Sequence, residues 1–401
     1  MIKLFKFLKI IPKLKFYLRM PSKKKLIVFD DETYPDFRYL TNDIEHFVLK
    51  IRYENVDQIY INPIVLFRTI LNFRGNIWTA YLVSIIQLIK PKIVITCTNS
   101  SSFKFFEIAK ILDKKINFMA IQCAANYDFN RFQHLYNQGI TTRDYSKDFY
   151  IPNFFCFGNY EIDDYKKKKN FVKNFNPVGS IRLANFLKEK NINNLTDIKN
   201  FEYDIYLVSD GIVSQFDKRF AAPGAVKEMG RYIKFIVRYV RENNKKFLCS
   251  FKRLNSSKEN LELELEFYKK SLDDDDYDYL INNSTINFTK NRHLSYEYML
   301  KSELTISTYS TMLRENLSLG RKTLSINFMD NNIFDFPLNG ICKLNNCSYF
   351  ELKDRIDKIL RLTNFEYLKE LENKNNYLMN FDKNNSTIDK IKEKINTCLN
   401  K

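Results

Sequence analysis

The pattern of apolar and polar positions over residues 303–328 predicts a strand, then a helix, then a second strand. Hydroxyl side chains gather where the first strand gives way to the helix, and a glycine stands where the helix should end. A helix that begins at the carboxyl end of a strand directs unpaired backbone N–H groups to that point, which favours an anionic ligand. The predicted unit comprises strand Leu304–Ser307, turn Thr308–Ser310, helix Thr311–Leu319, the glycine stop Gly320 and strand Thr323–Phe328.

Two faces are expected on the helix of this unit. Leu313 and Leu317 have the spacing to face the sheet, whereas Thr311, Glu315 and Ser318 continue a polar stripe that starts at Thr308. An ordinary β-α-β unit whose cap happens to be rich in Ser and Thr remains the alternative.

The same periodicities recur along the chain, and strands that alternate with helices are typical of doubly wound parallel sheets. We therefore expect an α/β fold of two Rossmann-like domains facing a central cleft. The predicted strands are Lys25–Asp30, Lys92–Cys97 and Ile116–Gln122 in the first half and Asp204–Ser209, Lys246–Phe251 and Thr285–Phe288 in the second. The expected parts are a basic arm (1–24), an N-terminal domain (25–180), a helical connector (181–200), a C-terminal domain (201–365) and a C-terminal helical tail (366–401).

Composition supports folded domains, because 45% of the 401 residues are hydrophobic. The net charge of +17 is uneven: nine of the excess cations lie in the first 25 residues, which contain no acidic residue. Their cations alternate with Leu, Phe and Ile, which predicts an amphipathic helix on an anionic membrane surface; a solvated basic tail is the alternative. Charges and Pro12 interrupt any membrane span or secretory signal. Seven scattered cysteines are typical of reduced thiols in a cytoplasmic protein.

Basic residues follow the predicted strands of the second half. Lys252 and Arg253 stand directly after one strand and could neutralise a phosphate or diphosphate. Arg292 could add a phosphate contact, and His293 a phosphate contact or a proton donor, although a loop histidine without a role is the plainer interpretation.

Polar strand exits in the first half could bind a sugar acceptor, and one carboxylate could remove its hydroxyl proton. Any single one could instead be a capping or turn residue. The acceptor candidates are Asn99, Ser100, Gln122 and Asn126, and the candidate bases are Asp30, Asp31 and, in the second half, Asp210.

Several chemistries are disfavoured by the motifs that the sequence lacks. The carboxylates of the Asp273–Asp276 run diverge as neighbours in sequence, so a solvated helix cap is expected there rather than a metal site. The sequence contains no Cys/His ligand spacing, Walker loop or Gly-x-Gly-x-x-Gly. Nucleoside triphosphate hydrolysis and nicotinamide redox chemistry are therefore not expected.

Several segments together resemble bacterial surface-carbohydrate biosynthesis proteins, the O-antigen or capsule transferases of the GT-B glycosyltransferase fold. They are residues 89–111, INFMAIQCAAN (116–126), YIPNFFCFGNYEIDDYKK (150–167), NPVGSIRLANFL (176–187) and the unit described first. The similarity covers most of residues 25–365, but Cys123–Ala125 depart from a glycine-containing form of the family segment.

The resemblance implies a C-terminal half that binds the nucleotide of an activated sugar and an N-terminal half that binds the acceptor. It also implies catalysis without a metal or cofactor, because a helix N-terminus and cations stabilise the departing phosphate. Lys252 and Arg253 would contribute here, and Glu315 matches a carboxylate that holds donor hydroxyls. The turn residues Ser307, Thr308, Tyr309, Ser310 and Thr311 would complete the donor site.

The leading hypothesis is a cytoplasmic glycosyltransferase, peripheral to the inner face of the membrane. It would transfer a CMP-linked acidic sugar or a UDP- or GDP-linked sugar to a surface polysaccharide or lipid-linked glycan. One alternative is polyol-phosphate transfer from a CDP-alcohol, although His293 is the only histidine of the second half. The other is a non-catalytic nucleic-acid-binding protein, motivated by the charge; the leading hypothesis expects no nucleic acid partner.

Overall fold

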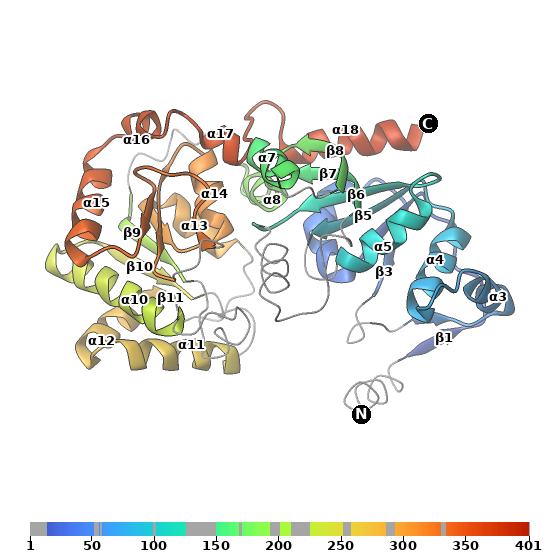
Figure 1. Cartoon of the computed structure of the whole chain (residues 1–401), viewed down its shortest axis with the longest axis horizontal. Coiled ribbons are helices and arrows are strands. Elements are labelled where there is room, and N and C mark those ends of the chain that lie inside the picture. Colours follow the sequence, from blue (N-terminus) through green and yellow to red (C-terminus); the bar gives the residue numbers. More distant parts are fainter. Residues whose placement is uncertain are drawn as a thin grey trace.

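The computed structural model describes residues 14–51, 56, 58–98, 102–125, 150–167, 171–192, 201–209, 225–251, 258–285, 293–329 and 334–400. Within these residues the chain forms two α/β halves side by side (Figure 1), each built on a parallel sheet. The predicted fold class of two Rossmann-like domains is confirmed. Among the described helices, none combines the length and apolar character that crossing a bilayer requires.

The N-terminal sheet has the strand order β3-β2-β5-β6-β7-β8, and every neighbouring pair is parallel. Its strands are β2 (Leu26–Phe29), β3 (His46–Leu49), β5 (Ile93–Thr98), β6 (Asn117–Gln122), β7 (Tyr150–Cys156) and β8 (Phe171–Pro177). The short helices η2 (Asp31–Phe37) and α2 (Arg38–Thr41) follow β2, and the longer helices are α3 (Pro63–Leu71), α4 (Ile77–Ile89), α5 (Ser102–Leu112) and α7 (Asn159–Lys167). Helices α3 and α4 are separated by a short turn that contains Gly75, where φ is +92°.

The C-terminal sheet has the strand order β11-β10-β9-β12-β13-β14, again with parallel pairs. Its strands are β9 (Tyr203–Val208), β10 (Phe247–Ser250), β11 (Ser284–Thr285), β12 (Ser302–Ser307), β13 (Lys322–Asn327) and β14 (Lys343–Asn345). The associated helices are α10 (Ala225–Glu242), α11 (Lys258–Ser271), α12 (Asp274–Asn282), α13 (Leu294–Leu300), α14 (Thr311–Ser318), α15 (Tyr349–Arg361), α16 (Asn364–Glu370) and α17 (Asn375–Leu378).

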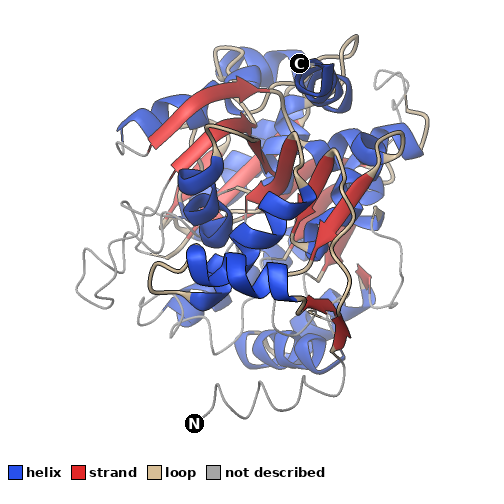
Figure 2. Ribbon diagram, turned by 90° about the vertical axis from the view of Figure 1, so that its right-hand side faces the viewer, coloured by secondary structure: helices blue, strands red, loops and turns tan. Residues whose placement is uncertain are grey.

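Both faces of the N-terminal sheet are covered by helices (Figure 2), so its strands read as continuous apolar runs. Ile27 and Phe29 of β2 pack into one core with α4 and α5. Leu26 and Val28 of the same strand pack into the core on the other face. The period of two along each strand therefore supplies two separate cores.

The chain passes between the halves twice, through α8 (Ile181–Glu189) and through the segment after α17. Helix α8 places Ile181 and Ala184 in the N-terminal core, whereas Leu183 and Phe186 enter a core of the C-terminal half. The chain then returns after α17, and α18 (Thr387–Asn400) lies along the N-terminal half (Figure 1). Three isoleucines of α18, at positions 388, 391 and 395, are fully buried there, and each such burial contributes on the order of 1.5–3 kcal/mol.

The amino-terminal segment differs from the expected helix where it is described. Residues Lys15–Tyr17 form strand β1, which pairs in parallel with β4 (Gln58–Tyr60). The rings of Tyr17 and Tyr60 stack with centroids 5.4 Å apart, and this cross-strand contact outweighs the helical spacing of the segment. Residues 1–13 lie outside the described residues, so the remainder of the arm stays a prediction.

Candidate functional site

The strand-turn-helix-strand unit of residues 302–327 has the predicted form. Ser310 is the N-cap of α14, and its Oγ accepts a hydrogen bond from the Met312 backbone N–H at 3.4 Å. Leu313 and Leu317 are fully buried against the sheet, and Gly320 has a φ of +77°, which suits a helix stop. The predicted order of strand, turn, helix and strand is therefore confirmed. The predicted polar stripe is not a free face, because Thr308, Glu315 and Ser318 are buried.

The hydroxyl groups of the turn divide into two kinds. Ser307 Oγ donates to the Val208 carbonyl at 2.7 Å, and Thr308 Oγ1 lies 3.8 Å from Met229 Sδ, so both buried side chains fasten the end of β12. Tyr309, Ser310 and Thr311 are only partly buried. The part of the turn that a ligand could reach therefore consists of these last three residues.

The N-terminus of α14 faces the N-terminal half. Thr311 Oγ1 accepts a hydrogen bond from the backbone N–H of Ala125, which follows β6, at 2.9 Å. Because the strands of each sheet are parallel, this contact brings the carboxyl ends of β6 and β12 together. The expected donor and acceptor sides of the site thus meet at this point.

Glu315 lies in the contact between the halves. Its carboxylate accepts hydrogen bonds from Ser180 Oγ at 2.5 Å and from the Tyr296 hydroxyl at 2.9 Å, and the residue is 1% exposed. Burial raises the pKa of Glu315, and the two hydroxyl donors oppose that rise. A role of Glu315 in holding donor hydroxyls stays a prediction, and it would require the Ser180 and Tyr296 hydroxyls to move away from the carboxylate.

A buried ion pair that the sequence did not indicate lies beside Glu315. Arg314 Nη1 is 2.6 Å from Glu161 Oε1, and the two side chains are 5% and 4% exposed. Gln122, a predicted acceptor residue, is fully buried and donates to Glu161 at 3.3 Å while accepting from the Phe157 N–H at 2.9 Å. Burial raises the pKa of Glu161, and the charge of Arg314 opposes the rise.

The candidate bases Asp30 and Asp31 follow β2 at the carboxyl edge of the N-terminal sheet. Asp30 is fully buried and has a φ of 80°, a left-handed conformation that costs roughly 1–3 kcal/mol and is common at functional positions. Asp31 Oδ1 is shielded from solvent and accepts no hydrogen bond from the residues that the structure describes. Both observations suit a functional carboxylate, and the role of Asp30 or Asp31 as the base stays a prediction.

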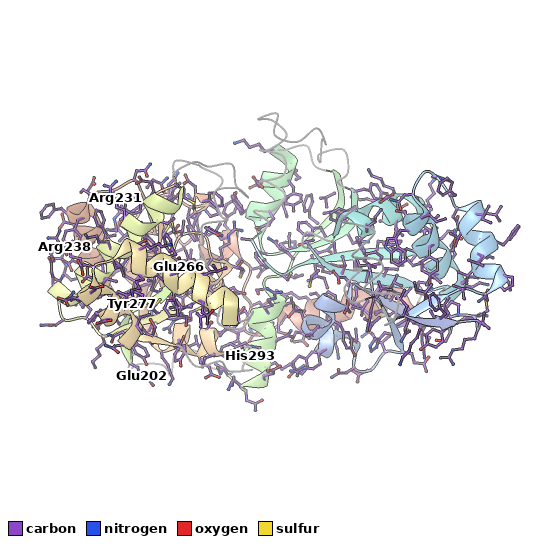
Figure 3. The ribbon with its side chains drawn as sticks, turned by 90° about the horizontal axis from the view of Figure 1, so that it is seen from below. Glu202, Arg231, Arg238, Glu266, Tyr277 and His293 are labelled. Atoms are coloured by element: carbon purple, nitrogen blue, oxygen red, sulfur yellow. The ribbon has the colours of Figure 1, made fainter. Side chains whose placement is uncertain are left out.

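His293 lies at the junction of the two halves (Figure 3). Its Nε2 is 2.6 Å from Glu189 Oε2 of α8, and its ring lies beside that of Phe186, with centroids 5.5 Å apart. In this structure His293 therefore connects α13 to α8. Its expected part in catalysis stays a prediction.

The remaining predicted site residues lie outside the described residues. They are Asn99, Ser100, Asn126, Asp210, Lys252, Arg253 and Arg292.

A second buried polar group, also not indicated by the sequence, stands at the carboxyl end of β9. Ser209 Oγ hydrogen-bonds to Glu264 of α11 and lies 2.6 Å from the Tyr268 hydroxyl. All three residues are buried. The sequence offered only Glu264 as a signal for this group. Glu264 belongs to a helix rich in glutamate, so its position resembles an exposed one.

One group of side chains among the described residues has the composition and spacing of a metal site. The ligand atoms of Asp36, Cys97 and Cys123 lie within 4.8 Å of one another, and all three residues are buried. Arg182 Nε, however, lies 3.0 Å from Asp36 Oδ2 and already supplies a positive charge there. By contrast, Asp273 caps α12 by accepting from the Asp276 N–H at 3.0 Å, as expected for the acidic run.

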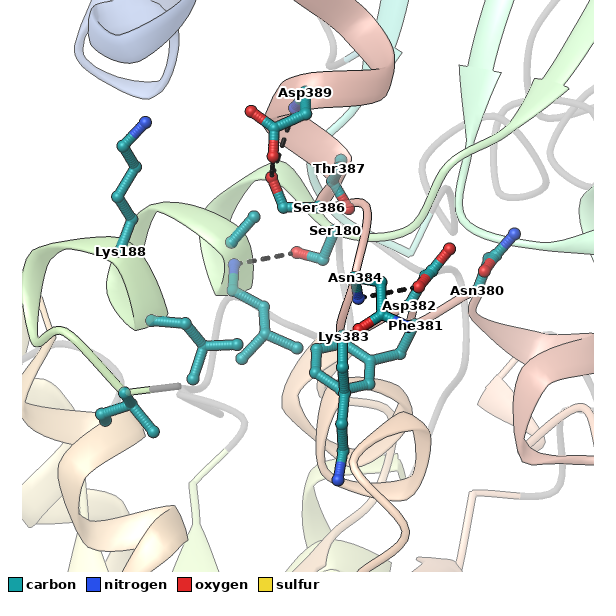
Figure 4. Close-up of a pocket in the computed structure, with 14 residues that line it drawn as sticks. Ser180, Lys188, Asn380, Phe381, Asp382, Lys383, Asn384, Ser386, Thr387 and Asp389 are labelled. Atoms are coloured by element: carbon teal, nitrogen blue, oxygen red, sulfur yellow. Dashed lines mark hydrogen bonds between the residues drawn. The ribbon is translucent and has the colours of Figure 1, made fainter. Parts of the chain in front are cut away.

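A cavity of about 460 Å³ lies between α8 and the segment that leads into α18 (Figure 4). Ser180, Lys188, Asp382 and Asp389 are among its lining residues. Ser180 joins this cavity to the Glu315 contact, since its Oγ donates to that carboxylate.

Comparison with solved structures agrees with this architecture. UDP-N-acetylglucosamine 2-epimerase from Rickettsia bellii superposes with a TM-score of 0.52 at 10% identity, over 94% of this chain and 96% of that one. The wall teichoic acid polymerase TagF gives a TM-score of 0.46 at 12% identity over 94% and 90%, and MurG from Acinetobacter baumannii gives 0.44 at 9% over 94% and 100%. The class defined by the topology is the GT-B fold of two facing Rossmann-like domains. No protein-family model and no curated protein matches the sequence.

Proposed function

We propose that this protein is a metal-independent glycosyltransferase that moves a sugar from a nucleotide-activated donor to a surface polysaccharide or lipid-linked glycan. The observation that carries the proposal is the contact of Thr311 with Ala125, because it sets a helix N-terminus opposite the carboxyl edge of the other sheet. The donor is a CMP-linked acidic sugar or a UDP- or GDP-linked sugar. The proposed location is the cytoplasmic, inner face of an anionic membrane.

In this proposal the donor phosphates bind at the N-terminus of α14. Ser310, Thr311 and the first backbone N–H groups of the helix stabilise the charge that develops on the leaving phosphate as the sugar–phosphate bond of the donor breaks. Lys252 and Arg253 neutralise the remainder of that charge. Asp30 or Asp31 takes the proton from the acceptor hydroxyl as it attacks the sugar.

The test is the thermal stability of the purified protein with CMP, CDP, UDP, GDP and ADP, because a ligand that binds the folded state raises the melting temperature. We expect one nucleotide to stabilise the protein in the presence of EDTA, and Lys252→Ala to remove most of that shift. Lys234→Ala, at an exposed position of α10, is the matched control. No shift with any nucleotide, or an unchanged shift in Lys252→Ala, would contradict the proposed donor site.

Polyol-phosphate transfer from a CDP-alcohol is the second candidate, because the partly buried hydroxyls of Ser310 and Thr311 suit either phosphate donor. Product analysis separates the two reactions, since one forms a glycosidic bond and the other a phosphodiester. Nucleic acid binding, the remaining alternative, predicts that affinity for DNA survives deletion of residues 1–25.

A further inference from the structure

Large apolar side chains are exposed together at one end of the N-terminal half. Among the described residues thirteen large hydrophobic side chains are exposed, and ten of them come from residues 16–20 and 64–77, which we call the apolar tip. Leu18 is 75% exposed, Ile70 70% and Phe67 62%. Monomeric proteins rarely expose so many neighbouring apolar side chains without a binding role.

The geometry of α3 explains this exposure. Asn62 caps the helix and Pro63 begins it, and only Val65 and Thr69 of its nine residues are buried. A surface helix normally carries polar residues on its outer face, whereas α3 carries Ile64, Phe67, Ile70 and Leu71 there.

The two segments of the apolar tip adjoin. Asn62 Nδ2 donates to the Arg19 carbonyl at 3.1 Å, and the Ile61 N–H donates to the Tyr17 carbonyl at 2.9 Å. Figure 1 shows β1 and α3 at the end of the N-terminal half that is remote from the C-terminal half. The apolar tip is therefore one surface, away from the contact between the halves.

The charged residues within the two segments that form this surface have one sign. Residues 14–29 and 58–98 contain no Asp or Glu. Lys15, Arg19 and Arg74 are exposed beside the apolar side chains. A second copy of this chain would bring like charges together, whereas an anionic bilayer offers phosphates to the cations and an apolar interior to the side chains.

We propose that the apolar tip docks on an anionic lipid bilayer, with the outer face of α3 in the lipid interface and the surrounding cations at the headgroup phosphates. The proposal rests on the membrane-peripheral location proposed above and assigns the contact to α3 and the β1 segment as well as to the arm. It requires no reaction, so it is measured without donor or acceptor. If no nucleotide binds, the membrane contact can still be observed. If the apolar tip does not bind lipid, the nucleotide test is unaffected.

The position of Trp78 provides a direct probe. It is the only tryptophan of the chain and follows Ile77, which is 61% exposed in the apolar tip. With vesicles of 60% phosphatidylcholine and 40% phosphatidylglycerol, we expect brominated lipids to quench Trp78 fluorescence. Vesicles of phosphatidylcholine alone should bind at least about tenfold more weakly.

The decisive variants replace exposed side chains, so they leave the core intact. Phe67→Gln with Ile70→Gln should lower binding of the full chain to anionic vesicles by at least about tenfold, as measured by flotation. Phe350→Gln with Phe365→Gln is the matched control, because these side chains are 72% and 75% exposed in the C-terminal half. The control should bind as the wild type does.

Three results would overturn the proposal. The first is unchanged flotation of the Phe67→Gln, Ile70→Gln variant. The second is vesicle binding that is lost when residues 2–13 are deleted but is unchanged by substitutions in the apolar tip. The third is a dimer in light scattering that the same double variant converts to a monomer, because the surface would then be an interface between copies.

Discussion

Arg314 of α14 and Glu161 of α7 form an ion pair between the two halves of the molecule, with Nη1 and Oε1 2.6 Å apart and both side chains almost fully buried. Tyr160 adds to it, because the Arg314 guanidinium lies 5.1 Å from the centre of its ring. Arg314 stands three positions after Thr311, the last residue of the turn proposed to bind the donor phosphates. The relative position of donor and acceptor sides thus depends on a contact that water scarcely reaches.

Replacement of Glu161 tests how much this ion pair stabilises the folded protein. In Glu161→Gln the Arg314 charge stays buried without its carboxylate, and we expect a loss of about 3–5 kcal/mol in the free energy of unfolding. Urea denaturation measures it. Glu266→Gln is the control, because the Lys270–Glu266 pair is 2.5 Å long but exposed and should contribute at most about 0.5 kcal/mol. Equal losses in the two variants would show that the buried pair contributes no more to the free energy of unfolding than the exposed pair does.

Glu315 should respond differently, because its partners Ser180 and Tyr296 are hydroxyl groups. The pKa of Glu315 is raised by burial above its ordinary value of 4.5, so the folded state binds more protons than the unfolded state between those two pKa values. The stability that this carboxyl contributes is therefore complete below pH 4.5 and is lost as the pH rises through the folded-state pKa.

The Glu315→Gln variant removes that titration while keeping an acceptor oxygen for both hydroxyls. We expect the stability of the variant relative to wild type to increase from pH 4 to pH 7, as measured by urea denaturation at each pH. A difference that stays constant over this range would mean that the carboxyl does not titrate differently in the two states.

Arg321 offers a test of a buried cation that binds backbone carbonyls. Its Nη2 donates to the carbonyl of Leu300, the last residue of α13, at 2.8 Å and to that of Ser302, the first residue of β12, at 2.7 Å. Burial lowers the pKa of Arg321 to about 10. Arg321→Met should destabilise the protein by about 2 kcal/mol, because buried carbonyl oxygens lose a charged donor. Thermal denaturation measures the change, and a variant as stable as wild type would show that water replaces the guanidinium.

Local patterns in the sequence were sufficient to predict several of the helices and strands. The unit of β12, α14 and β13 was predicted to within about two residues because a hydroxyl cap, paired leucines and Gly320 mark its boundaries. The hydrophobic runs of β2, β5 and β6 gave the N-terminal sheet for the same reason. Periodicity is sufficient where each element buries its own apolar face.

Contacts between distant segments had no such signal. Glu161 and Arg314 are 153 positions apart, and each stands on a helix whose charged residues resemble a solvated face. The isoleucines of α18 mark an apolar helix face, but their spacing does not say that the chain returns to the N-terminal half. Likewise, the cations around β1 suggested a helix because its partner β4 lies 43 positions away.

Gly179 allows the return of the chain to be tested directly. It has a φ of +97°, and a Cβ there would lie 2.1 Å from the Asn380 carbonyl oxygen, in the segment that leads to α18. Gly75 has a similar φ of +92° but nothing within 4 Å of that position, so Gly75→Ala measures the conformational cost alone, about 1–2 kcal/mol. We expect Gly179→Ala to cost at least about 2 kcal/mol more in the free energy of unfolding, because a backbone atom must move.

Hydrogen exchange provides a second measurement of the same contact. It should accelerate in α18 in Gly179→Ala and not in Gly75→Ala, since the displaced segment loosens the packing of Ile388 and Ile391. Equal stability losses with unchanged exchange in α18 would mean that the contact at Asn380 does not hold the helix in place.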